Sequence, residues 1–501
     1  MTFGAVVWWQ GRRRRPERTL AEGEEGPENR GVAVRGAVSM LNELEQAQVY
    51  ALRLVLPAWR TTNSHALQIE AGCMPMEHYL EKILDKFALG LANRALNHTL
   101  RRRSGLFGAP GGQVYNGHNR AQRPPIPFPP VGGSGRRTDT RLTALVARCD
   151  KDIERMVWDR PPWWMALGNM DEVTLRRAED FPRDKEEAAR HIGQKIDGRS
   201  EELCVFTDGS RLEDGETGAG WAVYLRGGEL RSGGVKTGSN KEVFDAEVIG
   251  MLCGFDFAFR YAREYGINII TLYVDNNAAL QAVASGKSAS SLAQVKEFDG
   301  RARRWLRRDP RNRLRLSWVP GHAEVDGNER ADALAKEAAR SDDPVLFLAT
   351  SVSFSKRQVA ARANEAWQAA WSTALSASGP SWYFQTRVTV PSHRPQPTLT
   401  LSRRDLGILL QIRTGHGDFA RYHVRFGHDE ADCKCLCGEA RSPLHPLSCP
   451  VFARHHHLLR DKEGQRHSDA ALINERDGVK ALLAFIRASG AYERRTYARG
   501  P

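Results

Sequence analysis

The fold follows from a short apolar run that ends in a carboxylate, Leu203-Cys204-Val205-Phe206-Thr207-Asp208-Gly209-Ser210. Cys204 and Phe206 share one side of a strand with Asp208, because side chains alternate between the two faces of a strand. The carboxylate therefore ends an apolar face, where a lone charge is costly. Asp-Gly-Ser is also a common turn after a strand, so this run alone leaves both a turn and a functional carboxylate open.

Three more carboxylates occupy similar places in the sequence. Glu247 lies on a helical stripe of apolar and small residues that begins near Val243. Asp275 closes a β-branched run that reads as a buried strand, and Asp332 lies in the first turns of a helix. Converging carboxylates repel one another unless a cation neutralises them. The set therefore predicts a metal site.

Each of these residues also has an ordinary structural interpretation. Asp275 can cap the helix that follows it, and Asp332 can be a solvated helix charge. Asp326 with Glu329 resembles a capping box. His322, after a Pro-Gly pair, can be a plain loop histidine. A shared site is favoured because the acidic residues follow one another in this order, each at a strand end or near a helix start.

Four motifs in this order resemble the ribonuclease H domain of non-LTR (LINE-like) retrotransposon polyproteins. They are Phe206-Thr207-Asp208-Gly209-Ser210, Phe244-Asp245-Ala246-Glu247, Tyr273-Val274-Asp275-Asn276, and Trp318-Val319-Pro320-Gly321-His322 running into Asn328-Glu329-Arg330-Ala331-Asp332. All four catalytic carboxylates of that domain and its histidine have counterparts here. The resemblance implies endonucleolytic cleavage of the RNA strand of RNA–DNA hybrids with two Mg²⁺ ions, or with Mn²⁺ in their place.

The resemblance also implies a role for each residue. Asp208 would bridge both ions, while Glu247 and Asp275 would complete one side of the site. Asp332 would hold the ion on the side of the attacking water. His322 would move a proton or help the product leave. Carboxylate oxygens are hard ligands, which suit Mg²⁺ or Mn²⁺ better than zinc.

The pattern of residues 201–341 predicts an α/β domain with a mixed five-stranded sheet flanked by helices, and the resemblance implies that this domain has the ribonuclease H-like fold. The expected strands are residues 204–207, 218–225, 230–236, 269–274 and 313–319, and the expected helices are residues 243–265, 278–284, 291–308 and one that contains Asp332. The carboxylates would then gather at strand and helix ends, where sites of α/β proteins usually lie.

Nucleic-acid contacts can be placed near this site. Asn276 and Asn277 are candidate readers of the 2′-hydroxyl that distinguishes RNA from DNA. Phosphate contacts are expected from a basic helix with an interleaved aromatic residue, which contributes Arg301, Arg303, Arg304, Trp305, Arg307 and Arg308. An ordinary solvated helix face is the alternative.

At 501 residues the chain should hold more than one domain. The only Asp-Asp pair, Asp342-Asp343, lies in a polar linker, so no polymerase active site is expected. The expected divisions are a helical module resembling the reverse-transcriptase thumb or connection (1–103), a Gly/Pro-rich linker (104–140), a lead-in segment (141–200), the ribonuclease H domain (201–341) and a helical region that contains a Cys/His segment (342–501).

Composition bounds the partners and the compartment. A net charge of +13 favours a polyanionic partner, and the resemblance makes that partner an RNA–DNA hybrid, with a retroelement reverse transcriptase as a further one. Eight cysteines in so long a chain indicate a reducing compartment rather than a disulfide scaffold. No apolar run is long enough to span a membrane. The chain is therefore expected to be intracellular, nuclear or cytoplasmic, and not secreted.

The segment 433–450 carries a second candidate metal site. Cys435, Cys437, His445 and Cys449 resemble the small Cys/His segment that ends many of these polyproteins, which implies a zinc ion with Cys433 as a spare. The Cys-x-Cys spacing is tighter than the usual zinc-binding spacing, so a metal-free segment is the other interpretation.

Two rival functions remain. One is a catalytically idle retroelement remnant that only binds RNA or a hybrid, although the presence of all five active-site residues argues against decay. The other is a DNA nuclease or transposase of the same fold, although the arrangement from His322 to Asp332 argues against it.

Overall fold

The computed structural model describes residues 32–93, 152–154, 166–197, 201–377, 383, 389–391, 396–428 and 433–492. The linker expected at residues 104–140 lies outside these residues, as does most of the lead-in segment before residue 166. The chain divides into two compact units. The sheet unit comprises residues 85–359, and the helical unit comprises residues 1–84 together with residues 360–501.

A mixed sheet of six strands forms the centre of the sheet unit. Its strands, in spatial order, are β1 (Val173–Arg176), β6 (Arg313–Trp318), β5 (Ile269–Val274), β2 (Glu202–Arg211), β3 (Thr217–Leu225) and β4 (Gly228–Lys236). The pairs β1–β6, β6–β5 and β5–β2 are parallel, and β2–β3 and β3–β4 are antiparallel. The five strands expected within residues 201–341 are all present, and β1 of the lead-in segment adds a sixth strand beside β6.

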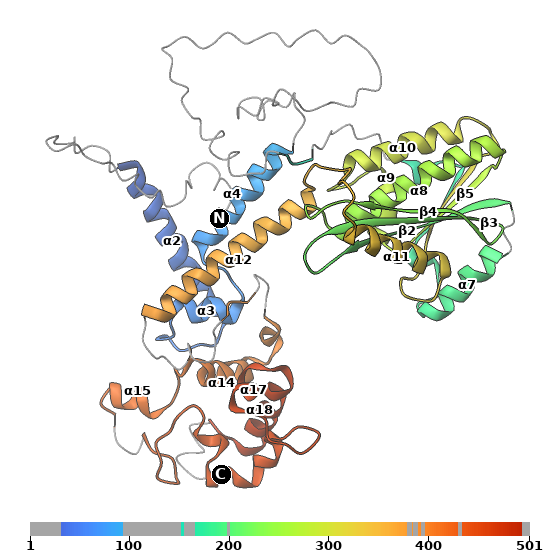
Figure 1. Cartoon of the computed structure of the whole chain (residues 1–501). Coiled ribbons are helices and arrows are strands. Elements are labelled where there is room, and N and C mark those ends of the chain that lie inside the picture. The colour runs from blue at the N-terminus through green and yellow to red at the C-terminus, as the bar shows by residue number, and fades with distance from the viewer. Residues whose placement is uncertain are drawn as a thin grey trace. The chain divides into compact units, whose positions relative to one another are not determined.

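Helices cover both faces of this sheet (Figure 1). The first face carries α8 (Val243–Tyr265), α9 (Asn277–Ser285) and α10 (Leu292–Leu306), and the second carries α7 (Lys185–Asp197) and α11 (Asp326–Arg340). Because both faces are covered, the first eight residues of β2 are all buried. Leu203 and Val205 enter the core under α8, whereas Cys204 and Phe206 enter the core under α7 and α11.

Glycines let α11 lie directly on β3. A Cβ added at Gly220 would come within 2.0 Å of the Ala331 carbonyl oxygen, and one added at Gly218 would come within 2.3 Å of that of Ala335. Real Cβ atoms do not approach so closely, so only glycine fits at both positions. This close packing fixes the distance between the sheet and the first turns of α11, which carry Asp332.

The helical unit is built from both ends of the chain. Its helices are α2 (Val32–Val55), α3 (Ser64–Ala71), α14 (Arg403–Thr414), α15 (Ala420–Arg425), α17 (Asp469–Asn474) and α18 (Arg476–Ser489), and α4 (Met76–Ala92) and α12 (Val352–Ala377) belong to it in part. Trp367 and Trp371 of α12 are both buried, against Ala66 and Ile69 of α3. Short 3₁₀ helices are η2 (Leu167–Asn169), η3 (Ala178–Asp180), η4 (Pro397–Thr400), η5 (His445–Leu447) and η6 (Pro450–Leu459).

Residues from the expected N-terminal module and from the expected C-terminal region belong to one compact unit. The reason is that the apolar face of α3 is covered by α12 and α14, from a remote part of the chain. Among the described residues, no helix has both the length and the apolar character that crossing a bilayer requires.

Candidate functional site

Asp208 lies near the end of β2, opposite Gly220 of β3, and only 6% of it is exposed. Its Oδ1 accepts a hydrogen bond of 2.6 Å from the backbone N–H of Gly209. A Cβ at Gly209 would lie 2.5 Å from the backbone nitrogen of Glu247, so the first turns of α8 pack directly on β2. That contact brings Glu247 beside Asp208.

Asp208, Glu247 and Asp275 meet in space. Each offers one ligand oxygen, and these oxygens all lie within 4.8 Å of one another. Glu247 is 2% exposed, and its Oε2 has no hydrogen-bond partner. A buried polar atom without a partner is unfavourable and usually marks an absent ligand or a functional role. Three carboxylates from β2, α8 and the end of β5 therefore form a group with the donor chemistry of a hard-cation site.

Burial and mutual repulsion raise the pKa of all three carboxyl groups. Burial and the charges of Asp275 and Asp332 raise the pKa of Asp208 to about 7. Burial and the charges of Asp208 and Asp275 raise the pKa of Glu247 well above its usual value. Burial also raises the pKa of Asp275, and a hydrogen bond from Asn328 partly opposes this rise. A bound cation would remove the cost of ionising such a group.

The structure does not bring Asp332 of α11 into that group of three, although its negative charge helps to raise the pKa of both Asp208 and Asp275. One of its oxygens accepts a hydrogen bond of 2.6 Å from Lys336, one helical turn away. Ligand atoms of His322, Glu329 and Asp332 also lie within 4.8 Å of one another. Sequence reasoning assigned Glu329 only to a capping box, although its spacing of three residues from Asp332 puts both side chains on one face of the helix.

The alternative capping interpretations have different outcomes. The N-cap of α11 is Val325, and no side chain caps that helix, so the capping box of Asp326 and Glu329 is absent. Asn276, rather than Asp275, caps α9 by accepting hydrogen bonds from the backbone N–H groups of Ala278 and Ala279.

Known proteins match this part of the chain. The family model described as RNase H matches residues 200–340. These residues form an RNase H domain. A ribonuclease H from Syntrophus aciditrophicus (strain SB) is 29% identical over 153 residues, which cover 28% of this chain and 83% of that protein.

Solved structures also align with part of the chain. RNase H1 from Halobacterium salinarum NRC-1 is 24% identical and aligns with 27% of this chain and 96% of its own, with a TM-score of 0.21. The prototype foamy virus protease–reverse transcriptase is 16% identical and aligns with 29% of this chain and 22% of its own, with a TM-score of 0.23.

The arginines expected to contact phosphates divide into two groups within the RNase H domain. Arg301 pairs with Asp256 and Glu297, and Arg303 pairs with Asp299. The other three, Arg304, Arg307 and Arg308, are exposed and make no ion pair within the described ranges. The expectation that Trp305 interleaves with them as a stacking residue is wrong, because its ring is only 2% exposed and packs in the core under α8 and α10.

The four residues expected to hold zinc lie together outside the RNase H domain, in the helical unit. Ligand atoms of Cys435, Cys437, His445 and Cys449 all lie within 4.8 Å of one another. The Sγ atoms of Cys435 and Cys449 are 3.7 Å apart, and Sγ of Cys437 is 3.3 Å from Nε2 of His445. A tetrahedral zinc with Zn–S bonds of about 2.3 Å requires two sulfurs about 3.8 Å apart. The cluster therefore has the donors and the spacing of a zinc site.

Proposed function

We propose that the RNase H domain hydrolyses the RNA strand of RNA–DNA hybrids by endonucleolytic cleavage. One observation carries this proposal: ligand oxygens of Asp208, Glu247 and Asp275, from three separate elements, lie within 4.8 Å of one another. Asp332 lies outside this group of three, and its negative charge helps to raise the pKa of Asp208 and Asp275. An ordinary core does not collect carboxylates, because each buried charge costs free energy.

The cofactor in this proposal is a pair of Mg²⁺ ions, with Mn²⁺ able to replace them. Hard carboxylate oxygens suit these cations, and the partnerless Oε2 of Glu247 is free to bind one. When bound, two such ions activate a water molecule and stabilise the charge of the leaving oxygen. We assign the binding of the ions to Asp208, Glu247, Asp275 and Asp332. The N–H of Gly209 holds the Asp208 carboxylate in place.

We assign proton transfer or product release to His322. Its ligand nitrogen lies within 4.8 Å of ligand oxygens of Glu329 and Asp332, at the border of the acidic group. Positioned histidines commonly contribute about 10²–10⁴-fold to hydrolysis as acids or bases.

Recognition of the hybrid is assigned to two sets of residues. Oδ1 of Asn277, two residues after Asp275 in the chain, is buried without a hydrogen-bond partner, and once turned outward it would accept a hydrogen bond from a ribose 2′-hydroxyl. Asn276 already caps α9, so its role would be to hold that turn in place. Arg304, Arg307 and Arg308 would contact phosphates.

The direct test offers the full chain a labelled RNA–DNA hybrid, duplex DNA and duplex RNA in Mg²⁺. Cleavage of only the RNA strand of the hybrid supports the proposal, and its loss in Asp208→Asn assigns the activity to this site. Asp342→Asn, an exposed aspartate, is the matched control and should cleave normally. Cleavage of duplex DNA would instead identify a DNA nuclease. Tight hybrid binding without any cleavage would identify an idle binding protein.

We also propose a structural zinc ion held by Cys435, Cys437, His445 and Cys449. When bound, zinc would cross-link the turns that carry these residues, which otherwise pack around the buried Cys435 and Cys449. The measurement is the zinc content of the purified chain by atomic emission. About one equivalent is expected in the wild type and in Cys433→Ser, and its loss is expected in Cys449→Ser. Equal zinc in all three proteins would disprove this ligand set.

We further propose that the chain derives from a LINE-like retrotransposon polyprotein and acts with a reverse transcriptase. The support is the resemblance of its four acidic motifs, of residues 41–103 and of the Cys/His segment to such polyproteins. The test measures second-strand DNA synthesis by a separately supplied non-LTR reverse transcriptase. The wild-type chain should raise the yield and Asp208→Asn should not. Equal yields with both proteins would reject this partnership.

A further inference from the structure

The RNase H domain is preceded by a described segment that the family match does not cover, residues 166–197. We call its second half, residues 178–197 with η3 and α7, the α7 segment. Phe181, Ala188 and Ile192 of this segment are buried in a cluster with Val319 and Val325. The two valines stand at either end of the loop that carries His322, which we call the His322 loop (residues 320–324). The α7 segment therefore packs against both ends of that loop.

The backbone of the His322 loop has an unfavourable conformation at two residues. His322 has a φ of 52° and Glu324 has a φ of 57°, and neither is glycine. The left-handed region disfavours residues with a side chain, so two such residues close together need support from their surroundings. The α7 segment contributes to that support, through the hydrogen bond from Lys185 to Gly321 and the packing at Val319 and Val325.

Two contacts join the α7 segment to the loop more directly. Nζ of Lys185 donates a hydrogen bond of 3.3 Å to the carbonyl oxygen of Gly321, the residue before His322. The ring of Phe181 lies 5.7 Å from that of Trp318, whose Nε1 donates a hydrogen bond of 3.0 Å to the carbonyl oxygen of Asp275. Lys185 therefore links the α7 segment to the His322 loop. Phe181, through Trp318, links it to the backbone of Asp275, a candidate metal ligand.

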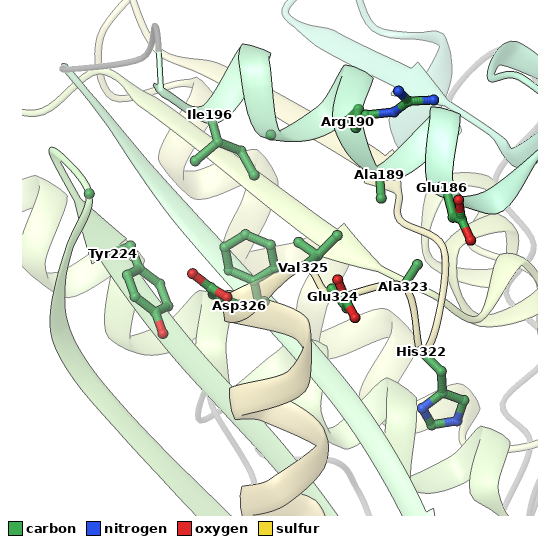
Figure 2. Close-up of a pocket in the computed structure, with 14 residues that line it drawn as sticks. Glu186, Ala189, Arg190, Ile196, Tyr224, His322, Ala323, Glu324, Val325 and Asp326 are labelled. Carbon is green, nitrogen blue, oxygen red and sulfur yellow. The ribbon is translucent and has the colours of Figure 1, made fainter.

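A cavity of about 740 Å³ lies between the α7 segment and the His322 loop. Figure 2 shows Ala189 of α7 directed toward the loop, while the imidazole of His322 points away from α7. The cavity leaves room for the loop to move toward α7. The few contacts that cross the cavity therefore restrain the position of the His322 imidazole.

We propose that Lys185 and Phe181 are positioning residues for His322. The α7 segment holds the His322 loop in its left-handed conformation and keeps the imidazole at the border of the acidic group. For catalysis this inference rests on the proposed ribonuclease activity. Its structural part, the restraint of the loop, stands independently of that activity.

The kinetic test uses the full chain and the exposed Lys185, whose loss should leave the fold intact. Lys185→Ala should lower kcat about five-fold with KM nearly unchanged, because one charge-assisted hydrogen bond to the loop is lost. Lys185→Arg should restore most of kcat, because a guanidinium can still donate to Gly321. Lys287→Ala removes the same charge at an exposed loop position and should leave kcat unchanged.

A double-mutant cycle separates positioning from general effects. In a His322→Ala background, which itself should lose about 10²-fold or more in kcat, Lys185→Ala should have no further effect, because it acts only through the imidazole. An equal five-fold loss in both backgrounds would overturn the inference.

A second measurement does not depend on activity. Hydrogen exchange of backbone amides in residues 320–325, without substrate, should become at least three-fold faster in Lys185→Ala and in Phe181→Ala, and stay unchanged in Lys287→Ala. Faster exchange in the two variants, together with a wild-type chain that cleaves no hybrid, would reject the proposed function but keep the restraint. Unchanged exchange and unchanged kcat in Lys185→Ala would reject the restraint, even if Phe181→Ala fails to fold.

Discussion

At the scale of single residues, Asp208 and Glu247 could be recognised from the sequence as functional candidates. A carboxylate at an otherwise apolar position is unusual, because burying its charge costs free energy. Both end up almost fully buried, at 6% and 2% exposure, in positions that their apolar neighbours already indicated. The same reasoning misplaced Trp305, because a helical pattern does not say which face is covered. The sequence also suggested only a capping role for Glu329, because the first residue of a helix can be placed at more than one position from sequence alone. In the structure the N-cap is Val325, and no side chain caps the helix.

The pKa of Asp208 gives a prediction for stability against pH without metal. A raised pKa means that the folded chain holds this proton more tightly than the unfolded chain. The stability it contributes is therefore complete below about pH 4 and is lost as the pH rises toward about 7. In EDTA the wild type should unfold at a lower temperature at pH 8 than at pH 6.

Asp208→Asn should remove much of the stability loss that the wild type shows as the pH rises. It should therefore raise the stability of the metal-free chain at pH 8 by at most about 4 kcal/mol, since a tenfold change in proton affinity is worth about 1.4 kcal/mol. Mg²⁺ should stabilise the wild type and have little effect on the variant. Thermal unfolding with Asp342→Asn as the control checks both statements. A wild type that is most stable at pH 8 in EDTA would contradict them.

At the scale of elements, most strands and helices of the sheet unit lie where the sequence pattern predicted them. The β-branched run before Asp275 became β5 and the run before Asp208 became β2, because long apolar runs have few alternatives. By contrast, β1 has only four residues and ends in an arginine, and its partner β6 lies far along the chain. No local pattern in Val173–Arg176 could have revealed that pairing.

Glycine packing between β3 and α11 gives an element-scale prediction. Gly220→Ala would place a methyl group 2.0 Å from a backbone oxygen of α11 and should destabilise the sheet unit by about 1–3 kcal/mol or more. Gly300→Ala, at a position on α10 with no atom within 4 Å of the added methyl, should be neutral or stabilise by up to about 1 kcal/mol. Chemical denaturation measures both. Equal effects of the two changes would show that α11 does not pack as described.

The exposed arginines at the end of α10 predict a salt effect. Changing Arg304, Arg307 and Arg308 to Ala together should reduce the slope of log affinity against log salt for a hybrid by about 2–3, at about 0.9 per phosphate contact. Binding is measured with Asp208→Asn, so that no cleavage occurs. Arg311→Ala should leave the slope unchanged, because that guanidinium already pairs with Asp309. A triple variant with the wild-type slope would remove these residues from the interface.

At the scale of the whole molecule, the helical unit depends on a buried ion pair between distant parts of the chain. NH1 of Arg413 lies 2.6 Å from Oε2 of Glu70, and both side chains are 2% exposed. Neither residue could be singled out from the sequence, because a glutamate and an arginine separated by hundreds of residues carry no pattern.

Breaking this pair should be costly. Glu70→Ala leaves the charge of Arg413 buried and uncompensated, which should reduce the free energy of unfolding of the helical unit by about 3–5 kcal/mol. Adding Arg413→Met should recover part of that loss. Asp477→Ala breaks an ion pair with Lys480 in which both side chains are exposed, and should cause no measurable loss. A loss in Glu70→Ala no larger than in Asp477→Ala would contradict the burial of the pair.

The two-ended construction of the helical unit also has a consequence for synthesis on the ribosome. Residue 84 ends its first part and residue 360 begins its second, so about 275 residues are translated between them. At about 5–20 residues per second, the apolar faces of α2 and α3 wait roughly 15–60 s for their partners. During that time the sheet unit can finish folding by itself, while the first helices need a chaperone or remain at risk of aggregation. Slower translation would lengthen the time during which the apolar faces of α2 and α3 remain uncovered.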